Sequence, residues 1–396
     1  MIQNAQNQPK MLNQIPEYIL NNQALNNAIS QLPKHYNFEI HKTISRIIET
    51  QERLQKQNIL INLQFPEGLL LYSCMISDIL TTFTGCDTFI SGDVTYGACC
   101  IDDLTADEMQ ADYIIHYGHS CLVPINECAV KTLYVFVEIN IDIKHLYETI
   151  KKNFPDKNIK YYLMGTIQFN TYIHLLRKQL EEDGYKIAIP QEKPRSSGEV
   201  LGCTSPKLEV SQDSRNIVIF VCDGRFHMES TMIQNPQFEF FQYDPYTYRL
   251  TIEKYDNPKM MNLRYQQILH CQKVQPQLVC IIMSTLGRQG STQILSRIEE
   301  LLKKHQIQYF TLLISEVNFE QLNQLNEVDV FIQIACPRLS IDWGVQFQKP
   351  LLTPYETYVM LGEADWKQIY PMDYYSNNGG AWTNYYHKQK IKLNYE

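Results

Sequence analysis

The sequence has no long hydrophobic run, no block of basic residues and no closely spaced cysteine pair of the CxxC type. A membrane-spanning helix needs about 18 or more consecutive apolar residues, so no membrane association is expected. Without a Lys/Arg block there is no electrostatic surface for direct binding of nucleic acid. The first ten residues, MIQNAQNQPK, lack the apolar core of a signal peptide, and we therefore expect a cytoplasmic protein.

Of the 396 residues, 44% are hydrophobic and 20% are charged, with a net charge of −8. This composition is typical of a soluble globular protein with two or three domains. The eleven cysteines are odd in number and widely spaced, and without an export signal they are expected to be reduced thiols. Cys74 and Cys280 lie in apolar periodic segments, where a thiol packs like a small hydrophobic side chain. Cys128 and Cys271 also look structural.

Residues 1–54 are predicted to form an N-terminal arm with a docking helix. The first ten residues, rich in Asn and Gln, are expected to be disordered. The stretch IPEYILNNQALNNAISQLP has helical spacing of its apolar residues, so it is expected to pack on the body of the protein.

From about residue 55 onward, predicted strands alternate with predicted helices. Strands at 59–65, 160–169 and 278–287 each lead into a helix, so a similar unit recurs roughly every 110 residues. This alternation predicts parallel sheets with helical crossovers. We predict an α/β fold of three related domains, at 55–150, 151–270 and 271–396; a single large doubly wound sheet is the alternative.

Cysteines recur in the turns that follow the predicted strands. In such sheets, ligands bind at the carboxyl ends of the strands, so these turns are candidate site segments. A cysteine there can be core filler, half of a disulfide or a metal ligand. The turns are TYGACC with Cys99 and Cys100, YGHSC with Cys121, LGCTSP with Cys203, VCDGRFH with Cys222 and IACPRL with Cys336.

Several long segments resemble the diphthamide synthase family, and within it the catalytic subunit of eukaryotic members. The resemblance covers roughly residues 12 to 385. The segments that carry it are GDVTYGACCIDDLTADEMQADYIIHYGHSCLVP, GEVLGCTSPKL, DGRFHMES, STLGRQGS, ACPRLSIDWG, KPLLTPYE and YPMDYY. The resemblance implies three α/β domains around a central cleft, each contributing one cysteine to a 4Fe–4S cluster: Cys99, Cys203 and Cys336.

The resemblance also implies an activity and its partners. The cluster would cleave S-adenosylmethionine by a radical route, and the 3-amino-3-carboxypropyl group would pass to a histidine of translation elongation factor 2. This is the first step of diphthamide synthesis. A related sister subunit is expected as partner in a heterodimer, together with a small electron-donor protein. Three thiolates on four irons leave one iron open, as an activating site requires.

Three other cysteines compete with the implied ligands. Cys100 is adjacent to Cys99, and sequence alone does not separate the two. Cys121 and Cys222 directly follow strands, so by the logic of the internal repeat they align with Cys336 better than Cys99 and Cys203 do. The resemblance favours Cys99 and Cys203.

A second group of candidates lies in STLGRQGS. Arg288, Gln289 and Gly290 precede a predicted helix, whose N-terminal amides suit a carboxylate such as that of S-adenosylmethionine; the alternative is a tight turn that requires glycine. His116 and His119 could assist proton loss from the target imidazole or simply form structural hydrogen bonds.

Polar residues near the candidate cysteines admit two interpretations. Asp223, Arg225 and His227 have a salt-bridged turn as the simpler explanation. Arg338, Ser340 and Asp342 follow Cys336 and could tune a cluster by hydrogen bonding. The 26 tyrosines are spread along the chain and mark no site.

Two other functions remain open at this point. The chain could be the non-catalytic redox sister subunit of the same complex. It could also be a zinc-stabilised scaffold without turnover, because thiolates bind zinc as well. The presence of LGCTSP favours the catalytic subunit, and a structural zinc would need four closed ligands.

Overall fold

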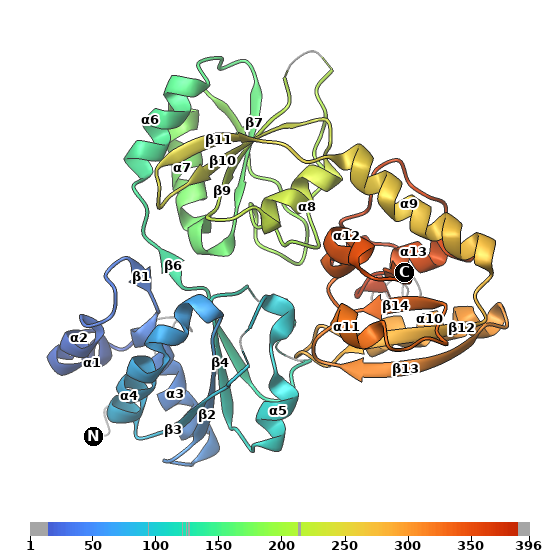
Figure 1. Cartoon of the computed structure of the whole chain (residues 1–396). Coiled ribbons are helices and arrows are strands. Elements are labelled where there is room, and N and C mark those ends of the chain that lie inside the picture. The colour runs from blue at the N-terminus through green and yellow to red at the C-terminus, as the bar shows by residue number, and fades with distance from the viewer. Residues whose placement is uncertain are drawn as a thin grey trace, which may run out of the picture.

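Three separate β-sheets follow one another along the chain in the computed structural model (Figure 1). The structure describes residues 15–386 apart from 94, 121, 124, 126, 213 and 214. Helices pack against each sheet, so the predicted α/β class is confirmed. None of the helices within the described ranges is long and apolar enough to cross a membrane.

All three sheets use the same strand order, in which the first strand of the unit lies between its second and third strands. The first sheet has the order β3-β2-β4-β5, the second β8-β7-β9-β10-β11 and the third β13-β12-β14-β15. Among the described strands of these three sheets, β11, the added edge strand of the second sheet, is antiparallel to its neighbour and the others pair in parallel. The strands are β2 (Leu60–Gln64), β3 (Asp87–Ile90), β4 (Tyr113–Tyr117), β5 (Thr132–Val135), β7 (Lys160–Gly165), β8 (Lys186–Ala188), β9 (Ile217–Val221), β10 (Glu239–Asp244), β11 (Arg249–Glu253), β12 (Leu278–Ser284), β13 (Gln308–Ile314), β14 (Val330–Ile334) and β15 (Leu351–Leu352).

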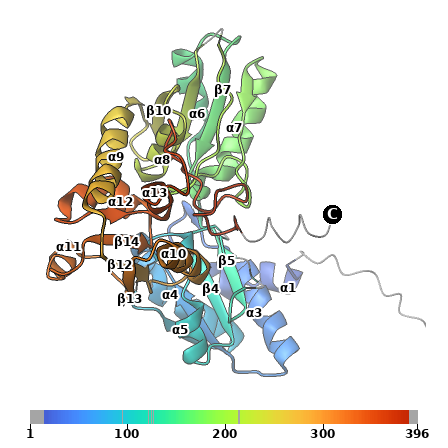
Figure 2. The ribbon, with the colours of Figure 1, turned by 90° about the vertical axis from the view of Figure 1, so that its right-hand side faces the viewer.

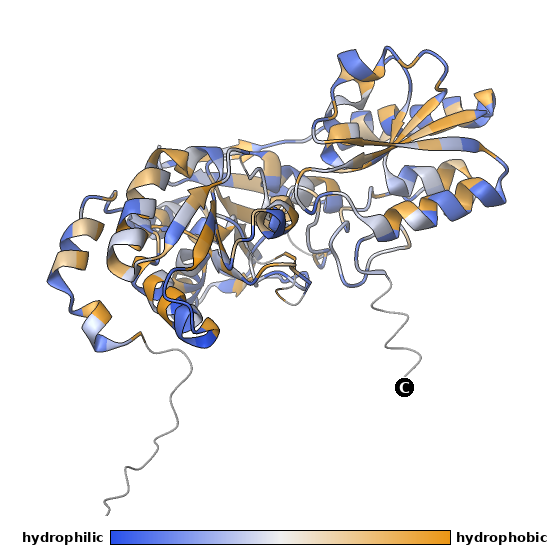
Figure 3. Ribbon diagram, turned by 90° about the horizontal axis from the view of Figure 1, so that it is seen from below, coloured by the Kyte–Doolittle hydropathy of each residue, from blue (hydrophilic) through white to orange (hydrophobic). Residues whose placement is uncertain are grey.

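The central strands β4, β9 and β14 are buried along their whole length. Parallel strands covered by helices on both faces read as continuous apolar runs, and Figure 3 shows hydrophobic residues concentrated in the strands. The covering helices are α4 (Ser73–Thr84), α5 (Asp103–Glu108), α6 (Ile143–Asn153), α7 (Asn170–Glu182), α8 (Phe226–Gln234), α9 (Asn257–Val274), α10 (Thr292–Lys304), α11 (Phe319–Leu322), α12 (Arg338–Trp343) and α13 (Pro354–Met360).

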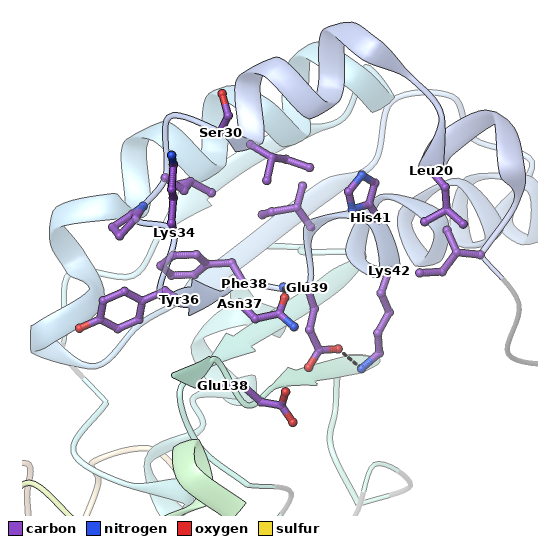
Figure 4. A pocket seen from close by; sticks show the side chains of 15 residues that line it. Leu20, Ser30, Lys34, Tyr36, Asn37, Phe38, Glu39, His41, Lys42 and Glu138 are labelled. Atoms are coloured by element: carbon purple, nitrogen blue, oxygen red, sulfur yellow. Dashed lines mark hydrogen bonds and ion pairs between the residues drawn. The ribbon is translucent and has the colours of Figure 1, made fainter. Parts of the chain in front are cut away.

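The N-terminal arm packs against the first domain. It comprises α1 (Glu17–Leu20), α2 (Gln23–Ile29), β1 (Tyr36–Asn37) and α3 (Ile40–Leu54), and β1 pairs with the short strand β6 (Glu138–Ile139). A cavity of about 660 Å³ lies along this arm, lined mainly by its own side chains and closed on one side by Glu138 (Figure 4). None of the candidate cysteines lines it. The predicted disorder of residues 1–10 lies outside the described residues.

Two predicted domain boundaries fall inside helices. The boundary at 150/151 cuts α6, whose Leu146 and Ile150 belong to the core of the second domain. The boundary at 270/271 cuts α9, whose Ile268 and Cys271 belong to the core of the third domain. Each helix precedes the first strand of its unit and packs with that unit. The predicted boundaries lie close to the first strands and therefore separate part of each helix from its domain.

The segment after α13 returns to contact the other two domains. Figure 2 shows this dark red segment running back toward the second domain. The Ser205 amide donates to the Met372 carbonyl at 2.9 Å and the Tyr375 amide donates to Thr204 Oγ1 at 3.0 Å. The Tyr385 hydroxyl donates to the Leu122 carbonyl of the first domain at 2.6 Å. The C-terminal segment therefore links all three domains.

A fully buried ion pair joins α9 to α13 in the third domain. Arg264 donates to both oxygens of Glu356, from Nε at 2.7 Å and from Nη2 at 2.6 Å, and both side chains are at most 1% exposed. The guanidinium also donates to the carbonyls of Ser340 and Leu351, while Glu356 accepts from the Thr353 amide. Every strong polar group of the pair is thus satisfied.

Replacing Arg264 should destabilise the third domain strongly. Arg264→Met leaves the Glu356 carboxylate buried and unpaired, at a cost of about 3–5 kcal/mol, so the apparent melting temperature should fall clearly by calorimetry. Arg264→Met combined with Glu356→Leu should melt closer to the wild type, because it leaves no lone charge. Arg177→Met, which removes an exposed pair with Glu181, is the control. A single variant as stable as that control would contradict the prediction.

Candidate functional site

Cys99, Cys203 and Cys336 line one cavity of about 510 Å³. Cys99 lies in a short 3-10 turn, η2 (Ala98–Cys100), after β3. Cys203 lies between β8 and β9, and Cys336 lies two residues after the end of β14. Each of the three side chains is partly exposed. The sequence separates these thiols by more than a hundred residues, and the three domains bring them to the same space.

The loop between β12 and α10 docks on the Cys99 turn. Gly287 has φ +51°, and a Cβ atom there would lie 2.6 Å from the backbone of Cys100. Beside it, Arg288 forms a bidentate ion pair with the buried Asp103 of α5. Its Nε and Nη2 atoms donate to the two carboxylate oxygens, each at 2.6 Å. Glycine is required because the backbones of two domains meet here.

The three predicted cofactor-binding residues occupy different places in this loop. The Arg288 guanidinium is engaged by Asp103, Gln289 lines the cavity with the cysteines, and Gly290 lies against the carbonyl of Ser284. Of the three, Gln289 is the residue that shares the cavity with the thiols. The N-cap of α10 is Ser291, which accepts from the Ile294 amide.

Arg338 joins the Cys203 loop to the third domain. Its side chain is 1% exposed, and Nη1 donates to the carbonyls of Phe226 at 2.7 Å and Gly202 at 3.3 Å. Nη2 donates to Glu229 at 2.6 Å, and Nε donates to Asp342. Because Gly202 precedes one candidate cysteine and Arg338 lies two residues after another, this arginine sets the distance between them.

Two tyrosines of the C-terminal segment also reach the cysteines. Tyr374 and Tyr375 are each 5% exposed, and their hydroxyls have no hydrogen-bond partner among the described residues. Burial and then the charges of Cys203, Cys336 and Cys99 raise the pKa of Tyr374. Tyr375 lines the cavity, so the interpretation that the tyrosines mark no site is wrong for this residue. The motif YPMDYY that contains it is recognisable in the sequence, but nothing in its spacing connects it to the cysteines.

The pKa values of the three thiols are raised by their surroundings. The hydrogen bond with Cys100 and burial raise the pKa of Cys99, to which the charges of Cys203 and Cys336 add. Burial raises the pKa of Cys203, and that of Cys336 to about 12. A bound cation reverses this balance, because a coordinating thiol is deprotonated outright.

The other cysteines lie in different surroundings. Cys100 Sγ is 4.0 Å from Cys99 Sγ and lies at the cavity wall, though its residue is only 3% exposed. Cys222 is fully buried in the core of the second domain. Cys271 and Cys280 are core residues as predicted, whereas Cys74 is exposed on α4, so the prediction of a core position for it is wrong. Cys121 lies outside the described residues.

Of the polar residues considered as candidates, some form structural contacts and others line the cavity of the cysteines. His116 is buried, with Nδ1 3.0 Å from Gln64 Oε1. Arg225 pairs with Glu229 and Glu253, which is the salt-bridged turn considered as the simpler explanation. His227 lines the cavity with the cysteines. Within the described ranges, no three His, Cys, Asp or Glu side chains converge tightly enough to hold a single metal ion.

A sequence profile described as "Putative diphthamide synthesis protein" matches residues 65–371. The chain belongs to this family. The resemblance inferred from the sequence motifs is therefore confirmed, and the family region contains all three candidate cysteines.

Curated relatives of the family match nearly the whole chain. They include subunit 1 of 2-(3-amino-3-carboxypropyl)histidine synthase from Dictyostelium discoideum, 49% identical over 94% of this chain and 78% of the relative. The same subunit from Schizosaccharomyces pombe is 45% identical over 94% of this chain and 85% of the relative. That from Bos taurus is 46% identical over 94% and 83%.

Solved structures of the family share the fold. The crystal structure of Dph2 from Pyrococcus horikoshii aligns with a TM-score of 0.66 at 25% identity, covering 83% of this chain and 93% of that one. A second structure of that protein, determined with a 4Fe-4S cluster, aligns with the same TM-score at 24% identity. The α/β architecture is thus common to the family.

Replacing Arg338 by lysine should loosen the Cys203 loop. A lysine retains the charge but cannot reproduce the planar set of donors, so it cannot hold Gly202, Phe226 and Glu229 at once. We expect hydrogen exchange at the amides of Thr204 and Ser205 to accelerate by about tenfold or more, equivalent to roughly 1.4 kcal/mol.

The matched control for this prediction is Arg225→Lys, at an exposed arginine that also pairs with Glu229. Exchange is read by mass spectrometry, with circular dichroism to confirm an intact fold. Equal exchange rates in Arg338→Lys and the wild type would show that the arginine does not hold the loop.

Proposed function

We propose that this protein transfers the 3-amino-3-carboxypropyl group of S-adenosylmethionine to a histidine of elongation factor 2. The transfer would be the first step of diphthamide synthesis and would use a 4Fe–4S cluster held by Cys99, Cys203 and Cys336. The observation that carries the proposal is the convergence of these three thiols, one from each domain, on a single cavity. The names of the relatives and the cluster in the Pyrococcus horikoshii protein support it.

The residues at the cavity fit such a cluster. A single metal ion needs all its ligands about 2.0–2.3 Å from one point, and the described thiols are not arranged in that way. A cluster of several irons spreads its ligands over a wider space, and thiolates are its standard ligands. Three cysteines would leave one iron without a protein ligand, and the cavity beside them provides room for a substrate.

The remaining lining suits a molecule with an aromatic end and a polar end. Phe226 and Trp343 are 42% and 47% exposed and offer aromatic faces to the adenine ring. Gln289 offers a side-chain amide to the carboxylate or amino group of the methionine portion. In this proposal Arg288 and Gly290 contribute by positioning the loop against Asp103 and Ser284.

When bound, the cluster would supply the electron that cleaves the Cγ–S bond of S-adenosylmethionine, giving methylthioadenosine and a radical that adds to the target imidazole. The protein's own side chains would orient the sulfonium and keep the thiolates desolvated. Arg338, buried beside Cys336, stabilises negative charge on the thiolates and keeps the loop of Cys203 in place.

The proposed partners follow from the same assignment. Subunit 1 in the names of the relatives implies a complex with further subunits, and we propose a related sister subunit in a heterodimer. Elongation factor 2 would be the protein substrate, a small electron-donor protein would reduce the cluster, and the reaction would take place in the cytoplasm.

Two alternatives make different predictions for the metal. A zinc-stabilised scaffold would be colourless and would need a fourth closed ligand. A non-catalytic redox sister would carry a coloured cluster but would not cleave S-adenosylmethionine. The cavity beside the thiols favours the catalytic role over both, because neither a scaffold nor an electron carrier needs a substrate space.

The function is tested by anaerobic reconstitution with iron and sulfide. The product should be brown, and after reduction it should convert S-adenosylmethionine to methylthioadenosine and label elongation factor 2 in the presence of the sister subunit. Air-oxidised protein is the control. A coloured, reducible protein that releases no methylthioadenosine would refute the catalytic assignment.

Substitution of the three cysteines should remove the cluster. Cys99→Ala, Cys203→Ala and Cys336→Ala should each lose most of the bound iron and all transfer activity, because each removes one of only three protein ligands. Cys280→Ala and Cys222→Ala should keep their iron and lose only stability, within the about 0.5–3 kcal/mol usual for point changes.

The neighbouring pair provides a sharper control. Cys100→Ala should retain iron if Cys99 is the ligand, whereas iron loss in Cys100→Ala with retention in Cys99→Ala would exchange their roles. Full iron content in Cys203→Ala would refute the assignment of one ligand to each domain.

A further inference from the structure

A second pocket, of about 280 Å³, lies between the first and second domains and combines apolar side chains with several polar ones. Its wall includes His119 and Ser120 after β4, Thr166 after β7, and Glu199, Asp223 and His227 from the second domain. Ligands of α/β sheets bind beyond the carboxyl ends of strands, where the strand order reverses. Here those ends of two sheets face one pocket.

This pocket adjoins the cavity of the cysteines. Gly97, Leu201 and His227 line both spaces, and Gly97 and Leu201 each lie two residues before a candidate ligand. At the other side, Asp223 and Tyr246 of the pocket wall are exposed to solvent. The pocket therefore extends from the protein surface toward the thiols.

Several polar atoms in the pocket wall lack partners. Thr166 is 5% exposed, and its hydroxyl has no hydrogen-bond partner among the described residues. The same holds for Nδ1 of His119 and Nδ1 of His227, both of which are shielded from solvent. Buried polar atoms without a partner are costly, and a polar molecule in the pocket can form hydrogen bonds with them.

The wall favours a ligand that donates hydrogen bonds. Glu199 is 2% exposed; one carboxylate oxygen accepts from the Ser196 amide at 3.2 Å, and the Ser120 hydroxyl lies beside the group. Burial, and then the charge of His227, lower the pKa of His119 to about 4. Burial, and then the charge of Arg338, lower the pKa of His227 to about 4. A neutral imidazole offers one nitrogen as an acceptor, and in both rings Nδ1 is a buried atom without a partner among the described residues.

We propose that this pocket receives the target histidine ring of the protein substrate, with His119 holding a ring N–H and His227 accepting the proton that leaves C2. The proposal rests on the proposed function. His227 has this role because it lines both spaces, so it faces the target ring and the cysteine cavity together. His119 and Glu199 lie on the pocket side, where they orient the ring.

The overall transfer balances with this assignment. The Cγ–S bond of S-adenosylmethionine and the C2–H bond of the ring break, and a bond forms between Cγ and C2. Methylthioadenosine leaves with the sulfur, and one proton is released. The electron supplied for the cleavage is returned when the proton leaves, so no net oxidant or reductant is consumed. A base at C2 is therefore required once in each turnover.

The test compares two products of the reconstituted complex: methylthioadenosine released and aminocarboxypropyl groups attached to elongation factor 2. His227→Gln should lower the ratio of attachment to release at least tenfold, because the radical forms but the adduct does not lose its proton. With substrate protein carrying C2-deuterated histidine, this variant should also show a deuterium isotope effect on attachment that exceeds the wild-type value. His119→Gln should chiefly raise the concentration of elongation factor 2 needed for half-maximal attachment.

The matched control is His174→Gln, at an exposed histidine on α7. Iron content and circular dichroism identify any variant that has lost its cluster or fold, and in that case His227→Asn and His119→Asn take its place. Wild-type ratios and isotope effects in both pocket variants would overturn the proposal. A proportional loss of attachment and release would also overturn it, since that result indicates a structural role. If the wild type itself releases no methylthioadenosine, the proposed function fails instead.

Discussion

The site depends on the contacts between the three domains, and the buried guanidinium of Arg338 makes the most direct of these contacts. It donates to the carbonyl of Gly202 and to Glu229 of the second domain while it belongs to the helix that follows Cys336. The ion pair between Arg288 and Asp103 and the close approach at Gly287 do the same between the third domain and the Cys99 turn. Breaking such a buried pair leaves an uncompensated charge, which costs free energy. These ion pairs therefore hold the domains in fixed positions relative to one another.

The candidate ligands come from inequivalent places in the repeat. Cys99 and Cys203 lie between the second and third strands of their units, whereas Cys336 lies in the turn after a third strand. In the second domain, the turn after the third strand carries Cys222, which is buried in a core. The three sheets share a strand order. The site nevertheless uses turns at different positions in the three units.

The polar groups around the junction form two connected environments. The cavity of the thiols is bordered by apolar and aromatic side chains and by Tyr375 of the C-terminal segment. The pocket beside it combines apolar side chains with histidines, hydroxyls and carboxylates, and His227 lines both spaces. In the proposed reaction, the apolar cavity would shield the radical from water, and His227 would receive the proton from the target ring.

The sequence by itself determined the α/β class, the repeated units and the family, because apolar periodicity and long motifs are local properties of the chain. It also indicated Cys99, Cys203 and Cys336 through their motifs, although the internal repeat pointed to Cys121 and Cys222. Only the tertiary structure decided that these three thiols share a cavity, that Arg288 is engaged by Asp103 while Gln289 faces the thiols, and that Tyr374 and Tyr375 return to the site. It also decided that α6 and α9 pack with the domain that follows them. These features depend on which surfaces meet between domains, and no periodicity within one segment encodes the contact that another segment will make.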